Sequence, residues 1–101
     1  MRKITKMMTE SFKNGIDCKS GNSEVYNNAM YLHGNRIAWY ENDGMYVQAV
    51  FESFSRISNT TKERLNGIKG VKVYTKNKVS YLNGKEWDGR AIRVVEFKYN
   101  N

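Results

Sequence analysis

The residues best suited to a chemical task in this sequence are the basic and aromatic side chains between positions 62 and 85. Cationic side chains bind phosphates and aromatic rings stack on bases, so their combination is typical of a surface that holds a phosphate backbone or unpaired bases. The predicted binding residues are Lys62, Arg64, Lys69, Lys72, Tyr74, Lys76, Lys78 and Lys85. The alternative is the solvated outer face of a sheet, on which lysines keep a protein soluble and prevent edge pairing.

Enzymatic alternatives have weaker support in the sequence. The sequence has one histidine, His33, and one cysteine, Cys18, which are too few for a zinc site. A catalytic Cys–His pair has little support, because Cys18 is expected in a loop and His33 at a hairpin turn. Asp88, Glu96 and Lys98 are only loosely similar to the carboxylates and lysine with which nucleases hold a water-activating metal. We therefore expect a protein that is not an enzyme and needs no metal or cofactor. A small metal-dependent nuclease is the remote alternative.

The chain as a whole fits a single basic domain, 1–101. Its 101 residues are close to the commonest domain size, and its net charge of +7 favours a polyanionic partner: nucleic acid, a ribonucleoprotein or an acidic protein surface. The sequence has no apolar run of membrane-spanning length and no signal peptide, and a lone cysteine suits a reducing compartment. We expect a cytoplasmic protein without membrane contact.

The elements that would position the basic block begin with an amphipathic helix at 3–14, ended by Asn14-Gly15. Its apolar stripe consists of Ile4, Met7, Met8 and Phe12. Residues 16–24 are expected to form a loop. Alternation with period two and two glycine-containing turns then predict a three-stranded antiparallel meander over 26–54.

The second half of the chain predicts a short helix followed by hairpins. Thr60 and Glu63 match a capping box, Leu65 would enter the core, and Asn66-Gly67 would end the helix after about two turns. The expected strands are 71–75, 79–82 and 92–97, with a hairpin turn at Asn83-Gly84 and a corner at Asp88-Gly89 that Trp87 fills from the core side. The predicted fold class is α+β: an N-terminal helix, an antiparallel three-stranded meander, a short capped helix, then further antiparallel hairpin strands.

One short pattern occurs twice. YLHG at 31–34 is followed fifty residues later by YLNG at 81–84. Two related hairpin units around a shared core would explain the repetition. The alternative is coincidence, because many strands end in a turn that contains glycine.

Three segments, YLHGNRIA (31–38), TTKERLNG (60–67) and YLNGKEWDG (81–89), resemble a family of small uncharacterised proteins encoded by tailed bacteriophages. The similarity extends in order across residues 20–95. The resemblance implies an accessory protein that is expressed in the cytoplasm of a bacterial host cell, where such proteins commonly bind and redirect host or defence machinery. It implies no site residues.

The expected function is therefore to bind and modulate or inhibit a host or anti-phage defence complex, a nucleoprotein machinery such as a CRISPR-type effector, through the basic block. The alternative is a stand-alone DNA- or RNA-binding module.

Overall fold

The computed structural model describes residues 2–49 and 57–94 of the chain. Within these residues the architecture is α+β, as the sequence predicts. The predicted meander and the predicted last strand extend into positions 50–54 and 95–97, which lie outside the described residues, as do Glu96 and Lys98. No helix in the part of the chain that the structure describes is long and apolar enough to cross a membrane.

The N-terminal helix α1 spans Lys3–Asn14, which confirms the predicted helix, although Met7 of the predicted apolar stripe is 42% exposed. Met8 and Phe12 are fully buried on its inner face. The helix ends because Gly15 adopts the left-handed conformation, with φ of 70°, and donates its backbone N–H to the carbonyl oxygens of Phe12 and Ser11.

The larger sheet is antiparallel, with six strands in the order β1-β2-β3-β4-β5-β9. These strands are β1 Cys18–Ser20, β2 Ser23–Tyr26, β3 Ala29–Leu32, β4 Asn35–Glu41, β5 Gly44–Val47 and β9 Ile92–Val94. The predicted meander corresponds to β3, β4 and β5, and it continues into further strands on both sides. The expected loop over 16–24 is wrong, because Gly21, with φ of 57°, allows a tight turn that pairs β1 with β2.

The second half of the chain contains α2 Asn59–Asn66 and a smaller antiparallel sheet, β6 Val73–Lys76, β7 Val79–Leu82 and β8 Lys85–Glu86. The predicted capping box at Thr60 is wrong by two residues. Ser58 is the N-cap, and its Oγ accepts a hydrogen bond from the backbone N–H of Thr61 at 3.1 Å. The reason is that Ser58 has extended backbone angles, which direct its hydroxyl at the unpaired amides of the first turn.

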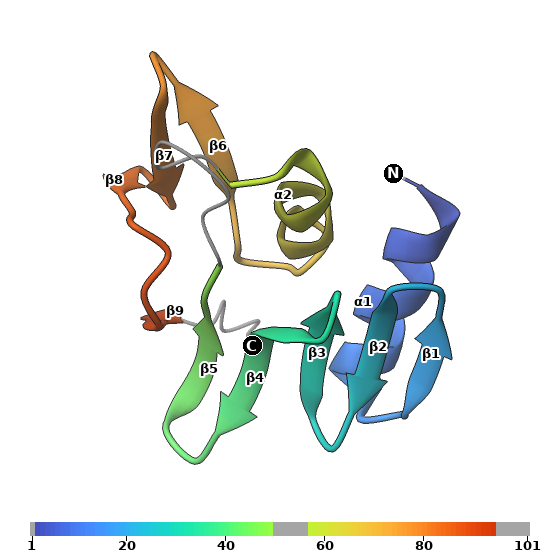
Figure 1. The fold of residues 1–101 in the computed structure, drawn as a ribbon. Coiled ribbons are helices and arrows are strands. Elements are labelled where there is room, and N and C mark those ends of the chain that lie inside the picture. Colours follow the sequence, from blue (N-terminus) through green and yellow to red (C-terminus); the bar gives the residue numbers. More distant parts are fainter. Residues whose placement is uncertain (1, 50–56, 95–101) are drawn as a thin grey trace.

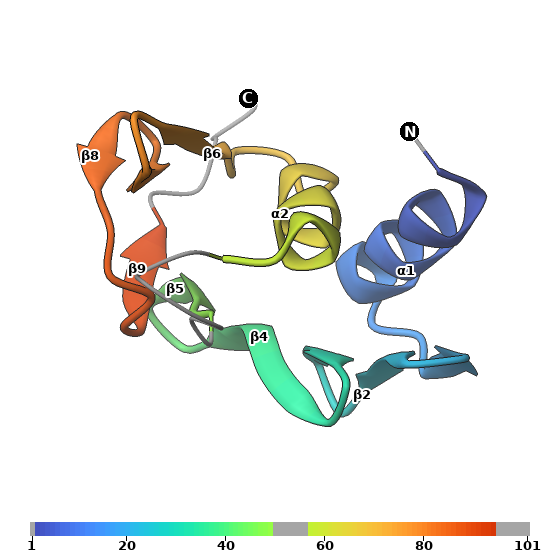
Figure 2. The same cartoon turned by 45° about the horizontal axis from the view of Figure 1, so that its top comes forward.

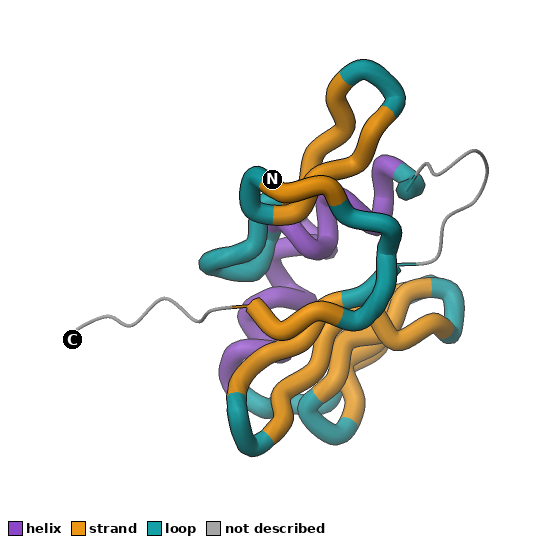
Figure 3. Tube along the Cα trace, turned by 90° about the vertical axis from the view of Figure 1, so that its left-hand side faces the viewer, coloured by secondary structure: helices purple, strands orange, loops and turns teal. Residues whose placement is uncertain are grey.

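Both helices cover the same face of the larger sheet, and the smaller sheet lies beyond α2 (Figures 1 and 2). The core between helices and sheet contains Phe12, Leu65, Met30 and Val47. Trp87 also belongs to this core and is only 4% exposed, as the sequence predicts. Figure 3 shows the β6–β7 hairpin projecting away from the larger sheet.

The repeated sequence pattern reflects two hairpins of the same geometry. Ser23 pairs with Leu32 across β2 and β3, and fifty residues later Val73 pairs with Leu82 across β6 and β7. The connecting turns, Asn27-Asn28, His33-Gly34, Asn77-Lys78 and Asn83-Gly84, have positive φ at both residues. Both occurrences of the pattern therefore lie at the same place in a hairpin of the same geometry, as either explanation predicts.

The two helices approach closely at Gly67, the residue after α2. A Cβ atom at this position would lie 2.7 Å from Cγ2 of both Thr5 and Thr9 on α1. Because φ of Gly67 is −74°, the backbone conformation itself does not require glycine. The expectation that Asn66-Gly67 ends the helix is confirmed, but glycine is needed there for space and not for a left-handed turn.

Gly67→Ala should lower the free energy of unfolding by about 1–3 kcal/mol, because the added methyl group overpacks the contact between the helices. Urea denaturation measures the change. Thr5→Ser and Thr9→Ser remove the two opposing methyl groups and keep both hydroxyls, so the loss caused by Gly67→Ala should be smaller in the Thr5→Ser/Thr9→Ser background. An equal loss in both backgrounds would show that crowding is not the cause.

Candidate nucleic-acid interface

The outer face of the β6–β7 hairpin brings together part of the predicted basic block. Lys72, Tyr74 and Lys76 follow one another with period two, so they share a face, on which both lysines are exposed and Tyr74 is half-buried. Tyr74 pairs with Tyr81 on β7, and the two rings are stacked with centroids 5.2 Å apart and planes inclined by 12°. We call Lys72, Tyr74, Lys76 and Tyr81 the tyrosine–lysine face.

Tyr81 is not among the binding residues predicted from the sequence. A signal for it exists, because a two-residue turn at Asn77-Lys78 places Lys76 opposite Val79 and therefore Tyr74 opposite Tyr81. Alternation with period two along the return strand predicts Lys78, Ser80 and Leu82 on one side of it, but β7 begins at Val79, so this prediction is wrong for Lys78. Lys78 lies in the turn, exposed and with φ of 67°, so it adds a positive charge at the tip of the hairpin.

Two asparagines fix the hairpin to the rest of the domain. At the end of α2, the Asn66 side chain donates to the carbonyl oxygen of Val73 at 2.9 Å and accepts from the Val73 N–H at 2.6 Å. Asn83 accepts from the Lys72 N–H at 2.7 Å and donates to the carbonyl oxygen of Gly70 at 3.1 Å. These bonds hold β6 in a fixed position relative to α2, and with it the tyrosine–lysine face.

The remaining predicted lysines lie elsewhere. Lys85 pairs with Leu82, on the sheet face opposite the tyrosines, whereas Glu86 pairs with Tyr81 and brings an acid to the tyrosine side. Lys62 donates from Nζ to Thr75 Oγ1 at 3.0 Å on the inner side of the hairpin. Lys69 is exposed, but it lines a separate groove beside α1.

Arg64 does not belong to the exposed surface at all. Its side chain is 4% exposed and donates from Nε to Ser23 Oγ at 3.1 Å and from Nη1 to Thr5 Oγ1 at 2.6 Å. Nη1 also donates to Glu63 Oε1 at 2.9 Å. The prediction that Arg64 is a binding residue on the surface is therefore wrong, because Arg64 is an interior residue. No local pattern indicates this position, because arginine is usually exposed unless it is paired.

Glu63 extends this interior network to the surface. Burial by itself raises the pKa of Glu63, but the Arg2 guanidinium, whose Nε lies 2.8 Å from Oε1, lowers it. Hydrogen bonds from the Thr5 hydroxyl and the Arg2 backbone, together with the charge of Arg64, act in the same direction. The outcome is a carboxyl with a pKa below its ordinary value.

The other candidate groups occupy structural positions. Cys18 lies on the helix side of the sheet, with its Sγ 3.8 Å from Met8 Sδ. His33 lies in a turn, where it lines a groove together with Lys19. Asp88 accepts from the Arg90 N–H at 3.0 Å, and this bond lowers the pKa of the Asp88 carboxyl. In residues 2–49 and 57–94, no group of three or more His, Cys, Asp or Glu side chains is arranged to hold a metal ion.

The fold and this surface define a small α+β protein with a projecting hairpin that carries lysines and stacked tyrosines. The chain belongs to the Kyanoviridae Gp96 protein family, which matches it over residues 1–101. The resemblance to phage-encoded proteins is thereby confirmed. No curated protein and no solved structure matches the chain.

Glu63→Gln should make stability less dependent on pH in acid. A carboxylate with a lowered folded-state pKa contributes stability that is complete above its unfolded pKa and is lost as the pH falls through its folded pKa. We expect the wild-type free energy of unfolding to fall as the pH drops below the ordinary glutamate value of 4.5, and the Glu63→Gln curve to be flatter there. Urea denaturation at a series of pH values measures both. Glu86→Gln is the matched control, and equal flattening in the two variants would contradict the assignment.

Proposed function

We propose that the chain is a non-enzymatic phage accessory protein whose tyrosine–lysine face binds nucleic acid within a host or anti-phage defence nucleoprotein complex. The observation that carries the proposal is the stacked pair Tyr74–Tyr81, half-buried on the outer face of a projecting hairpin and flanked by the exposed Lys72 and Lys76. By occupying nucleic acid in such a complex, the protein would modulate or inhibit it.

The chemistry of the face favours unpaired nucleotides. Tyrosine rings on a sheet offer a stacking platform for bases of any sequence. Lys72 directly precedes β6 and Lys76 ends it, a separation of four residues that corresponds to about 13 Å in extended chain, so the two lysines reach phosphates on both sides of a stacked base. Lys78 continues the positive charge to the hairpin tip. Lysine acts as a point charge without the directional fork of arginine, so the face is suited to the backbone and not to one base sequence.

An acidic protein surface is the competing partner for the same lysines. The tyrosine pair favours nucleic acid over an acidic protein surface, because stacked rings add affinity for bases and are not needed for attraction between opposite charges.

Changing Lys72, Lys76 and Lys78 together to Glu should abolish binding of a fluorescent single-stranded oligonucleotide, with little change in melting temperature because exposed charges contribute little to stability. If the three lysines neutralise three phosphates, log affinity of the wild type should fall with log salt at a slope of about −2. Anisotropy titrations at several salt concentrations measure both.

The control is the change of Lys3, Lys6 and Lys13 to Glu on α1, which alters the net charge by the same amount on another part of the molecule. This variant should keep most of the affinity. Tyr81→Leu, with its charge unchanged, should weaken binding by about tenfold, since stacking contributes roughly 1–3 kcal/mol per base. Equal losses in both triple variants, or full binding by Tyr81→Leu, would refute the tyrosine–lysine face.

The wider role is tested by affinity capture from host lysate with and without nuclease. A nucleoprotein complex that the wild type retains, and that nuclease treatment or the hairpin triple change releases, would support the proposal. Nucleic acid recovered without a protein complex would favour a stand-alone binding module. Protein partners that persist after nuclease treatment but are lost in the triple variant would favour an acidic surface.

A further inference from the structure

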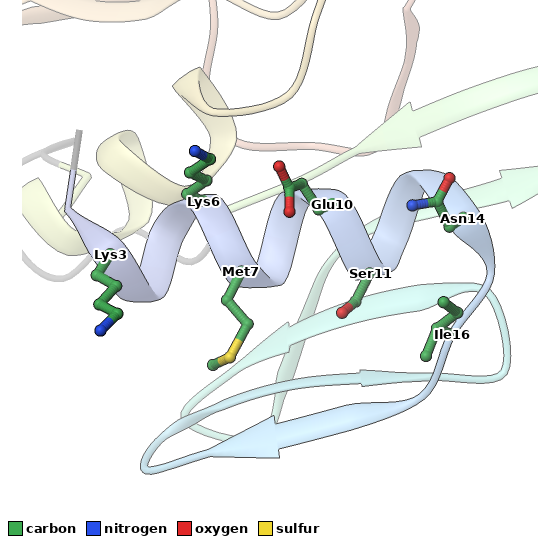
Figure 4. A pocket seen from close by; sticks show the side chains of 7 residues that line it. All are labelled: Lys3, Lys6, Met7, Glu10, Ser11, Asn14 and Ile16. Carbon is green, nitrogen blue, oxygen red and sulfur yellow. The ribbon is translucent and has the colours of Figure 1, made fainter.

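Among the described strands of the larger sheet, β1 is an edge strand, and next to this edge α1 carries an exposed apolar groove (Figure 4). Met7 is 42% exposed and Ile16 is 57% exposed, although both are large apolar side chains. In Figure 4 the Met7 side chain extends from α1 on the side where the strands lie, and Ile16 lies on the connection that follows α1. α1 is held beside β1 on this side, because Met8 Sδ lies 3.8 Å from Cys18 Sγ.

The backbone of β1 has unused pairing capacity at this edge. The turn at Gly21-Asn22 is closed by the pair Ser20–Ser23, and in an antiparallel ladder the next pair, Lys19–Glu24, is not hydrogen-bonded. The N–H and C=O of Lys19 therefore point away from β2. Among the strands that the structure describes, β1 pairs with β2 alone.

The side chains near the edge of β1 are charged on one face of the sheet and apolar on the other. Lys19 is exposed on the outer face of the sheet, whereas Cys18 on the same strand faces the helix, where Met7 and Ile16 lie. A strand added next to β1 would place alternate side chains on these two faces. Apolar side chains on its inner face would cover Met7 and Ile16, and acidic side chains on its outer face would lie beside Lys19.

The charges argue against a second copy of this chain as the occupant. Antiparallel pairing of two β1 edges centred on Lys19 would place the two Lys19 side chains opposite each other, which is destabilising. It would also bring together two chains that each carry a net charge of +7. Lys3 and Lys6 line the groove with only Glu10 as an acid, so the groove complements negative charge.

We infer that the edge of β1 and the groove on α1 form a docking site for an extended, acidic segment of a partner protein, in which apolar and acidic residues alternate. The segment adds a strand to the larger sheet through the backbone of Lys19 and buries its apolar side chains on Met7 and Ile16. The site goes beyond the proposed nucleic-acid contact. In Figures 1 and 2 it lies at the opposite end of the molecule from β6 and β8.

The test uses a fluorescent peptide of about eight residues in which glutamate and valine alternate. The wild type should bind it saturably. A block peptide of the same composition, and an alternating peptide with lysine in place of glutamate, should bind at least about tenfold more weakly. If the block peptide binds as tightly as the alternating one, charge alone explains the affinity and the strand-addition site is refuted.

The matched variants are Lys19→Pro and Lys19→Thr. Both substitutions remove the charge of Lys19, but only proline removes the backbone N–H that points away from β2. Neither substitution breaks a hydrogen bond to β2. Lys19→Pro should bind the alternating peptide about tenfold more weakly than Lys19→Thr does. The proposal also requires the peptide to slow hydrogen exchange of the Lys19 amide in the wild type, a readout that does not depend on the folding of any variant. Equal affinity in the two variants together with unchanged exchange would overturn it.

Two further measurements separate this site from the tyrosine–lysine face and from self-association. Ile16→Asp should weaken peptide binding, whereas the triple change of Lys72, Lys76 and Lys78 to Glu should leave it unchanged. Sedimentation of the wild type without peptide should show a monomer at all concentrations. A dimer that Lys19→Pro abolishes would identify a second copy, and not an acidic segment, as the occupant of the edge.

Discussion

The structure depends on one buried cation. Arg64 donates hydrogen bonds to Thr5 on α1, to Ser23 on β2 and to its neighbour Glu63, so a single guanidinium joins both helices to the larger sheet. A buried charge is costly unless its hydrogen-bonding groups are satisfied, and no buried side-chain nitrogen or oxygen among the described residues lacks a partner. The arrangement of α1, α2 and β2 is therefore tied to this contact, because any shift between them would leave a buried charge without its partners.

The position of the tyrosine–lysine face follows from the same contact. Arg64 and Leu65 hold α2 against the core. At the end of α2, Asn66 binds the backbone of β6, and Gly67 allows the helix end to approach α1 closely. The hairpin is thus attached to a helix that packs against the core, although its own outer face carries exposed lysines. A rigid attachment reduces the entropy that would be lost when a flexible strand binds a partner.

The two surfaces have complementary properties. The hairpin offers lysines and stacked aromatic rings, which suit a phosphate backbone with unpaired bases, whereas the β1 edge offers unpaired backbone groups and exposed apolar side chains. They lie at opposite ends of the molecule (Figure 1). If both proposed contacts form, the protein would hold the nucleic acid and a protein component of one complex at the same time, which would raise its effective affinity without additional contacts.

The sequence by itself determined the local elements. The apolar stripe of α1, the asparagine and glycine turns and the buried Trp87 follow from short-range periodicity and from backbone conformations that few residues tolerate. Alternation with period two also places Lys72, Tyr74 and Lys76 on one face, but it wrongly adds Lys78, which lies in the turn. Only the tertiary structure decided which cations remain exposed, because Arg64 is buried through partners 41 and 59 residues away in the sequence. Among the described residues, the pairing of β5 with β9 and the extension of the meander to six strands likewise depend on contacts between distant segments, which no local pattern specifies.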